Sequence, residues 1–406
     1  MEGFIPNVPV LVGDVHHTAS LEFAGIKSIN CKAVISLLED PILNLRVTLS
    51  SKILNPNLKV AVRSTTPEQS ANLMDVGADI VENPFLIIAQ QIQMSIKAPS
   101  LFKLENWLYK IEKLDSKTFT IPNEKIIICG YGRFGMTLNQ MFQKSNIHPI
   151  IIESDINVIE KAKNHNLKNI IHGNAEDKVI LEKADIQNSK VIIIGTNSDT
   201  TNLSIFSTVK RLNKKTLIIV RENELLDFSI FLHSKIDKIF LPSQILIHKS
   251  TNAIINPLCD IMIDLISEKD ELWGQQLLAK LIKNIDINPI SYELEINYEN
   301  AIEVYKYLKI PDNTISLNTL RLSRRDRTQY NNILPLLIVR DGKNILLPEL
   351  DFEIKLYDKI LFACDKNAKE DLEYILNNIY EFHYIIAGEE KKHFTNILNF
   401  TKKGNK

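Results

Sequence analysis

The feature that most constrains the fold of this chain is an internal repeat. The segment from Gly13 to Pro84 parallels the segment from Gly173 to Pro242, at an offset of 160 positions at the glycines and 158 at the prolines, after a two-residue gap. Short apolar, β-rich runs alternate with helical stretches in both segments, which is typical of a parallel sheet covered by helices. We therefore expect two copies of one α/β fold.

The second copy extends upstream into a glycine-rich turn. The apolar run Lys125–Cys129 predicts a buried strand; Gly130–Gly135 follows it with the spacing G-x-G-x-x-G, and a helical stretch and a strand at His148–Ile152 come next. Glu153 lies 18 residues beyond the last glycine. In dinucleotide-binding folds such a turn admits phosphates, and the acid accepts hydrogen bonds from ribose hydroxyls. The same residues also fit a Rossmann-like shell that keeps its glycines for packing alone.

Further strands are expected at residues 169–172, 191–195, 217–220 and 238–241, which together predict a Rossmann-like, doubly wound parallel sheet. Ligands of such sheets bind at the carboxyl ends of the strands. Arg221 at one strand end either faces an anionic ligand group or forms a salt bridge to a helix carboxylate. The predicted ligand-binding residues are Gly130, Tyr131, Gly132, Arg133, Phe134, Gly135, Glu153, Ser154, Asn174, Ala175, Thr196, Asn197 and Arg221.

The first copy is incomplete. Gly13 corresponds to Gly173, so the twelve residues before Gly13 leave no room for the first strand, the glycine turn and the second strand. We expect no dinucleotide site in this copy, an unpaired sheet edge at Val10–Val12 or at the strand containing Val34, and local disorder or alternative packing before about residue 100. Either the chain begins upstream of Met1 or its N-terminal part has been lost.

Composition narrows the class of protein and the cellular compartment to be expected. The chain has 406 residues, 45% hydrophobic and 24% charged, with a net charge of −1, which predicts a soluble chain of two to four domains without a global field for nucleic acid. Apolar runs are broken by charge well short of the ~20 residues of a spanning helix. The four cysteines, Cys31, Cys129, Cys259 and Cys364, lie far apart without a CxxC pair and indicate reduced thiols in the cytosol.

The repeat resembles the RCK family of regulatory domains, also called KTN or TrkA-N domains. The resemblance rests on KIIICGYGRFGMTL at residues 125–138 and IIIESD at 150–155, together with GNAED, TNSDTTNL and VRE farther along. It implies a cytoplasmic nucleotide-binding subunit that gates a potassium channel or Trk-type transporter at the inner face of the membrane. The implied ligand is NAD(H), or else ATP, ADP or AMP. Asn174 departs from the aspartate that the family usually carries.

The resemblance also implies partners. The implied partners are a membrane pore subunit and further copies of the chain, as a dimer or higher oligomer, and no nucleic acid. The amphipathic segments Phe85–Lys97 and Ser243–Pro257 would cross to a partner domain, as the equivalent helix does in the family; otherwise they are ordinary sheet-covering helices.

Residues 290–385 change character to short strands and a helix, and resemble the TrkA-C lobe, a small dimerising α+β module. Tyr357 stands where that lobe usually has glycine. The arginines at positions 321, 324, 325 and 327 form either a solvated loop or a site for an anionic effector. The expected parts are therefore 1–98, an incomplete first domain; 99–122, a linker; 123–260, a complete second domain; 261–289, a helical linker; 290–385, the C-terminal lobe; and 386–406, a tail.

An enzyme is the rival class. An NAD-dependent oxidoreductase needs a histidine, lysine or tyrosine acid/base facing the nicotinamide. The histidines are dispersed without metal-ligand or triad spacing, and no G-x-S-x-G, HExxH or GKS/T motif occurs. We expect no enzyme, no catalytic residue and no metal; the alternatives are an oxidoreductase of unknown substrate or a non-functional remnant of a longer channel protein.

Overall fold

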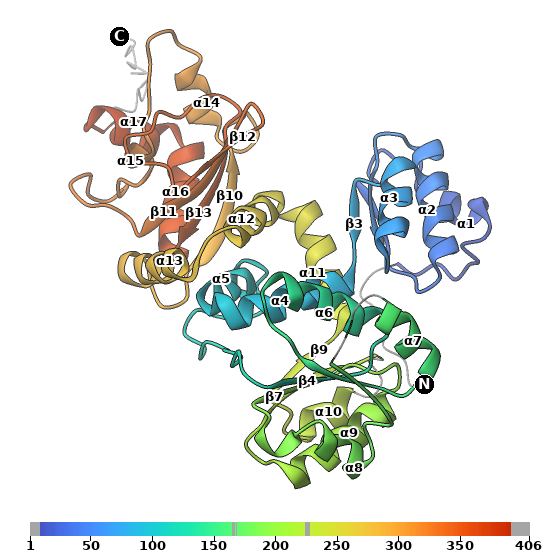
Figure 1. Ribbon diagram of the computed structural model, residues 1–406. Coiled ribbons are helices and arrows are strands. Elements are labelled where there is room, and N and C mark those ends of the chain that lie inside the picture. The colour runs from blue at the N-terminus through green and yellow to red at the C-terminus, as the bar shows by residue number, and fades with distance from the viewer. Residues whose placement is uncertain (1–8, 165–166, 168, 224–227, 391–406) are drawn as a thin grey trace, which may run out of the picture. The chain divides into compact units, whose positions relative to one another are not determined.

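The computed structural model describes residues 9–164, 167, 169–223 and 228–390 (Figure 1). The chain divides into two compact units: one comprises residues 1–112, 116–260 and 266–275, and the other comprises residues 113–115, 261–265 and 276–406. Residues 391–406 of the expected tail lie outside the described residues. Within the described part of the chain, no helix combines the length and apolar character needed to cross a membrane.

The second domain contains the predicted parallel sheet. Six strands lie in the order β6-β5-β4-β7-β8-β9, with every neighbouring pair parallel. The order reverses between β4 and β7, where doubly wound folds bind their ligands. All four residues of β7 are buried, because helices cover both faces. The strands are β4 (Ile126–Cys129), β5 (Ile150–Glu153), β6 (Ile170–His172), β7 (Val191–Ile194), β8 (Leu217–Arg221) and β9 (Lys238–Phe240).

Helices join these strands, and side chains cap two of them. Asp177 accepts a hydrogen bond from the backbone of Val179 and begins α8, and Ser198 accepts one from Thr201 and begins α9. The helices are α6 (Arg133–Lys144), α7 (Ile156–Asn164), α8 (Lys178–Lys183), α9 (Asp199–Leu212) and α10 (Phe228–His233), with a 3-10 turn at Ile186–Asn188.

The described residues of the first domain form a smaller parallel sheet of the same kind. Its sheet has three parallel strands in the order β1-β2-β3, and β1 has no partner on its outer edge among the described residues. The unpaired edge predicted at Val34 is confirmed. Val10–Val12 do not form the expected strand, because no described segment of the first domain corresponds to β5, the strand that pairs with the equivalent β6; these residues are exposed. The elements are α1 (Thr18–Phe23), β1 (Ala33–Ser36), α2 (Pro41–Leu54), β2 (Lys59–Arg63), α3 (Pro67–Asp75) and β3 (Ile80–Glu82).

The two domains repeat each other down to single hydrogen bonds. The Asn44 side-chain amide donates to the carbonyl of Arg63 at 3.2 Å, and Asn202 donates to the carbonyl of Arg221 at 3.1 Å. Two further side chains, Asp79 and Asn55, are matched in the same way. Asp79 and Asp237 accept from the amides of Val60 and Ile218, and Asn55 and Asn213 donate to the carbonyls of Ile26 and Ile186. This agreement confirms the repeat.

A helix from each domain crosses to the other. Helix α4 (Pro84–Lys97) follows β3 of the first domain, but its buried residues Ile88 and Ile92 belong to the same core as Phe134 and Leu138 of the second domain. Helix α11 (Pro242–Ile255) follows β9 of the second domain and contacts β2 and β3 of the first. The predicted crossing is thus confirmed, with the partner domain in the same chain.

Three helices follow these crossing helices. Helix α5 (Pro99–Leu108) occupies the start of the expected 99–122 linker. Helix α12 (Pro257–Ser267) begins before the second expected linker, 261–289, and ends inside it, and α13 (Glu271–Asn284) lies within that linker. The backbone amide and hydroxyl of Ser100 both donate to the carboxylate of Glu271, at 2.9 and 2.7 Å. The start of the first linker is therefore helical and fixed by hydrogen bonds.

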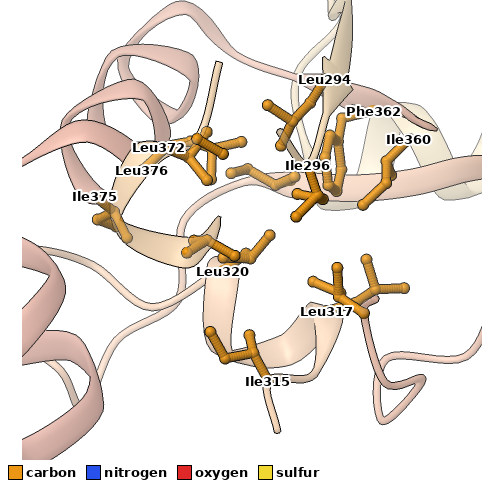
Figure 2. Packing of buried hydrophobic residues seen from close by; sticks show 14 of the residues in the cluster. Leu294, Ile296, Ile315, Leu317, Leu320, Ile360, Phe362, Leu372, Ile375 and Leu376 are labelled. Atoms are coloured by element: carbon orange, nitrogen blue, oxygen red, sulfur yellow. The ribbon is translucent and has the colours of Figure 1, made fainter. Parts of the chain in front are cut away.

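The C-terminal lobe is an antiparallel sheet with helices, as expected. The strand order is β10-β13-β11-β12. Figure 2 shows its core, in which Leu294 and Phe362 from the sheet pack against Leu372 and Ile375 from a helix. The elements are β10 (Ile290–Glu295), α14 (Ile302–Leu308), α15 (Leu317–Leu320), β11 (Ile333–Arg340), β12 (Lys343–Leu346), β13 (Lys359–Cys364), α16 (Lys366–Asn377) and α17 (Ile379–Ala387).

Two features of this lobe follow from its sequence. Arg340 forms a bidentate pair with the buried carboxylate of Asp358, at 2.7 and 2.6 Å. Tyr357, in place of the usual glycine, adopts a left-handed φ of 68°.

In the arginine cluster at positions 321–327, Arg324 pairs with Asp371 at 2.8 Å, and Arg327 donates to the carbonyl of Ile386 at 3.1 Å. Arg324 and Arg327 are therefore anchored within the lobe, while Arg325 and Arg327 are exposed to solvent.

Candidate functional site

Strand β4 leads directly into the glycine turn. The φ of Gly130 is 95°, which residues with a side chain rarely adopt. A side chain at Gly135 would place its Cβ 2.1 Å from the carbonyl oxygen of Gly130, so glycine is required where the turn contacts α6. Gly132 differs, because a Cβ there would meet no atom within 4 Å. Gly132 therefore keeps open the space that a ligand would fill.

Helix α6 begins at this turn and points its N-terminus toward that space. Gly132 is its N-cap residue, so no side chain caps the helix. The first-turn N–H groups of a helix have no partner within the helix, and the helix dipole makes this end attractive to anions. The turn thus offers backbone donors to a phosphate group.

The carboxylate of Glu153 lies at the end of the neighbouring strand β5. One oxygen accepts a hydrogen bond from the backbone amide of Tyr131 at 2.6 Å, and the other accepts from the amides of Ser154 at 2.7 Å and Asp155 at 2.9 Å. Glu153 therefore joins the glycine turn to the next strand end. The second oxygen also accepts from the Ser154 hydroxyl at 3.3 Å, whereas the oxygen bonded to Tyr131 accepts this one bond and retains a lone pair for a ligand hydroxyl.

These features surround a cavity of about 410 Å³ at the carboxyl ends of the strands. This volume lies within the range of roughly 300–1,000 Å³ that is usual for small-molecule sites. The described wall contains no lysine or arginine, so a phosphate would be bound by backbone amides and by uncharged hydroxyl and amide side chains. The lining residues are Gly130, Gly132, Ile152, Glu153, Ser154, Asp155, Val158, Gly173, Asn174, Ala175, Gly195, Thr196, Asn197, Ser198, Thr201 and Ile205.

Most of the predicted binding residues lie on this wall. Eight are in contact with the cavity and five are not. Two of the five support it from behind: Phe134 is buried in the core, and Tyr131 accepts a hydrogen bond from Asn139 at 3.3 Å through its hydroxyl. The eight are Gly130, Gly132, Glu153, Ser154, Asn174, Ala175, Thr196 and Asn197; the five are Tyr131, Arg133, Phe134, Gly135 and Arg221.

Arg221 is placed differently from the prediction. It is only 4% exposed, and its guanidinium donates to the carbonyl of Thr196 at 2.8 Å and lies over the ring of Phe85 at 5.3 Å. Burial lowers the pKa of Arg221 to about 10, with the charge of Asp199 opposing this shift. Arg221 therefore turns from the cavity toward the first domain, and no salt bridge to a helix carboxylate forms within 4.0 Å among the described residues.

Arg133 also leaves the cavity and connects the two domains. Its guanidinium donates to the hydroxyl of Thr65 in the first domain at 3.0 Å and lies over the ring of Phe85 at 5.4 Å. Because Arg133 is the first residue of α6, this contact starts one residue from Gly132. The glycine turn is thus connected to the first domain through the side-chain contacts of Arg133.

Several wall residues were not predicted. Asp155 and Gly195 line the cavity just after β5 and β7. The strand-end rule that selected Glu153 and Thr196 applies equally to these neighbours and would have found them.

Two segments of the chain match the model of a known domain family. The TrkA-N domain model matches residues 4–84 and 126–242. Potassium channel protein 1 of Methanocaldococcus jannaschii is 29% identical over 182 residues, which are 44% of this chain and 52% of the relative. Probable potassium channel protein 2 of the same organism is 29% identical over 151 residues, 37% of this chain and 41% of the relative. The chain spans about half the length, or less, of these curated relatives.

Among solved structures, the crystal structure of the GsuK RCK domain has a TM-score of 0.48 at 13% identity, covering 93% of this chain and 85% of that one. The GsuK channel bound to NAD has a TM-score of 0.48 at 11% identity, covering 90% and 70%.

Proposed function

We propose that this chain, which carries TrkA-N domain sequence at residues 4–84 and 126–242, is a nucleotide-binding regulatory component of a potassium channel or potassium transport system. The observation that carries the proposal is the position of helix α6. Its N-terminus faces the cavity, and its first residue, Arg133, is hydrogen-bonded to Thr65 of the first domain. A ligand at the turn would therefore act on the junction between the domains.

The proposed ligand is NAD(H), with ATP, ADP or AMP as the alternatives. The residues present fit such a ligand: Gly132 leaves its side of the turn open, and Glu153 lies at the wall with acceptor capacity to spare. The turn would bind phosphate through backbone amides, and Glu153 would accept hydrogen bonds from ribose hydroxyls. Asn174 adds no charge to the wall, so the carboxylates facing the ligand are those of Glu153 and Asp155.

Regulation would work through a shift between arrangements of the two domains. Helix α6 contacts α4, the helix that crosses from the first domain, so displacement of the glycine turn reaches both Thr65 and α4. A ligand changes this equilibrium only by as much as it binds one arrangement more tightly than the other. A membrane pore partner at the cytoplasmic face would sense the difference through the domains connected to it.

The composition of the wall favours regulation over hydride transfer. Nicotinamide-dependent oxidoreductases commonly use a histidine, lysine or tyrosine as proton donor or acceptor. The described residues that line the cavity include none of these. The chain's relatives named as potassium channels support the same choice.

The proposal is tested by the thermal stability of the full chain with NAD+, NADH, ATP, ADP and AMP. A ligand that binds only the folded state at 100 times its Kd stabilises by about 2.7 kcal/mol. This raises the melting temperature by roughly a few degrees. Gly132→Asp should abolish the shift, because a carboxylate would enter the space that the turn keeps open for phosphate. Gln140→Glu, on the exposed side of α6, is the matched control and should retain it. No shift with any of the five nucleotides would refute the proposal.

A further inference from the structure

Lys238, the first residue of β9, lies in an aromatic cage. Its ammonium nitrogen is 5.5 Å from the ring centre of Phe102, 5.6 Å from that of Phe119 and 5.9 Å from that of Phe240. The carboxylate of Glu112 completes the cage at 3.1 Å. The side chains of the ion pair are only 22% and 29% exposed, so solvent screens it in part. We call these five residues the Lys238 cage.

The first domain shows that the fold does not require a charge at this position. At the repeat offset of 158, Lys238 corresponds to Ile80, the first residue of the equivalent edge strand β3. Lys238 faces the same side of the sheet as Phe240, two residues along the strand, and Phe240 belongs to an apolar core. An ammonium group on such a face costs free energy unless partners compensate it. The lysine therefore indicates a contact that is specific to the second domain.

Two partners of Lys238 lie at the ends of one segment between α5 and β4. This segment, residues 112–119, begins at Glu112, ends at Phe119 and contains no helix or strand. We call it the strap. Its ends belong to the same compact unit as the second domain, whereas residues 113–115 belong to the unit that contains the C-terminal lobe. The strap therefore leaves the unit of the second domain and returns to it within a few residues.

The middle and the ends of the strap are attached differently. Asn288, two residues before β10, donates its side-chain amide to the carboxylate of Asp115 at 3.1 Å, within the lobe unit. Lys103 of α5 donates to the carbonyl of Ser116 at 2.6 Å. Lys103 thus fixes one point of the strap to α5, whereas Lys238 fixes both ends of the strap to the sheet.

We propose that the Lys238 cage is a clamp that couples the C-terminal lobe to the second domain by holding both ends of the strap on edge strand β9. With the ends held, the middle of the strap has a short reach, because a chain of n residues spans at most about 3.5 Å × n. Release of Lys238 lengthens the mobile segment. The chain also joins the two units around α12 and α13, so release should widen the range of positions of the lobe rather than detach it. This inference is independent of nucleotide binding.

The chemistry of the cage predicts which changes release the strap. Arginine keeps both the positive charge and the contact with aromatic faces, whereas a neutral side chain loses both. Salt should also weaken the clamp, because the Debye length falls from about 10 Å at 0.1 M to about 3 Å at 1 M ionic strength and the ion pair is partly exposed.

Hydrogen exchange of the full chain, read on peptides that cover residues 109–119, tests the clamp. Lys238→Gln should make exchange in the strap at least about tenfold faster. Lys238→Arg should keep it slow. Lys214→Gln, which removes an exposed lysine of the same domain, is the matched control and should change nothing. Unchanged exchange in Lys238→Gln, or equally fast exchange in Lys238→Arg, would overturn the proposal.

Distances between spin labels test the coupling to the lobe, in a Cys31→Ser background. Labels at Lys215→Cys in the second domain and Lys343→Cys in the lobe, both exposed positions, report the distribution of distances between the two parts. Lys238→Gln should broaden this distribution, and Lys238→Arg should not. A label pair within the second domain, Lys183→Cys and Lys215→Cys, should keep its distribution in both variants. An unbroadened distribution between domain and lobe in Lys238→Gln would refute the coupling, even if the strap exchanged faster.

Discussion

Ile88 allows the exchange of helices between the domains to be tested quantitatively. The residue follows the first domain in sequence, yet its fully buried side chain packs in the core of the second domain with Ile126 and Phe134. Replacing a fully buried isoleucine by alanine removes three carbons and leaves a cavity, which costs about 2–5 kcal/mol. We expect Ile88→Ala to destabilise the second domain by this amount.

The assay is hydrogen exchange of the native chain, read on peptides that cover β4 and β7. Ile88→Ala should lower the protection factors in these strands by at least roughly 30-fold, the factor that corresponds to a loss of about 2 kcal/mol. Leu86→Ala is the matched control on the same helix; Leu86 is 41% exposed, and its truncation should change protection little. If Ile88→Ala lowered protection only in β1 to β3, α4 would belong to the first domain and the exchange of helices would be wrong.

Three further predictions concern the C-terminal lobe and the thiols. Arg340→Ala should destabilise the lobe by about 3–5 kcal/mol in urea unfolding, because it leaves the buried carboxylate of Asp358 without its partner; a midpoint like that of wild type would contradict this. Tyr357→Gly should stabilise the lobe by about 1–2 kcal/mol, because φ is 68° there, whereas Tyr298→Gly, at a position without a left-handed φ, should not stabilise it. Ellman's reagent should modify half-buried Cys31 first, because burial raises the pKa of the Cys129 thiol and raises that of Cys364 to about 12. Cys31→Ser should therefore remove the fast phase of thiol modification. A fast phase that persists in Cys31→Ser would refute this assignment.

The strands, the sheet class and most of the cavity wall could be predicted because each depends on local patterns. The apolar run before Gly130 determines a buried strand, and the acid at Glu153 follows from the length of one βαβ unit. Parallel strands bring their carboxyl ends to one edge, which is why Thr196, far from Gly130 in sequence, was also expected at the cavity.

The direction of Arg221 could not be predicted in this way. The strand-end rule places its backbone at the correct edge, but its side chain turns toward Phe85, a residue of a helix that arrives from the other domain. Similarly, the amphipathic pattern of α4 shows that one face is buried but not which sheet that face covers. Both features depend on contacts between residues more than a hundred positions apart or on a pairing of domains that the local sequence does not encode.

We expect the second domain to bind one adenine-containing nucleotide per chain, since the glycine turn found among the described residues lies in this domain. Isothermal titration calorimetry of the full chain with NAD+, NADH, ATP, ADP and AMP measures this directly. We expect saturable binding of at least one of these nucleotides with one site per chain, and loss of that binding in Gly132→Asp but not in Gln140→Glu. Absence of binding with all five, or binding that survives Gly132→Asp, would contradict it.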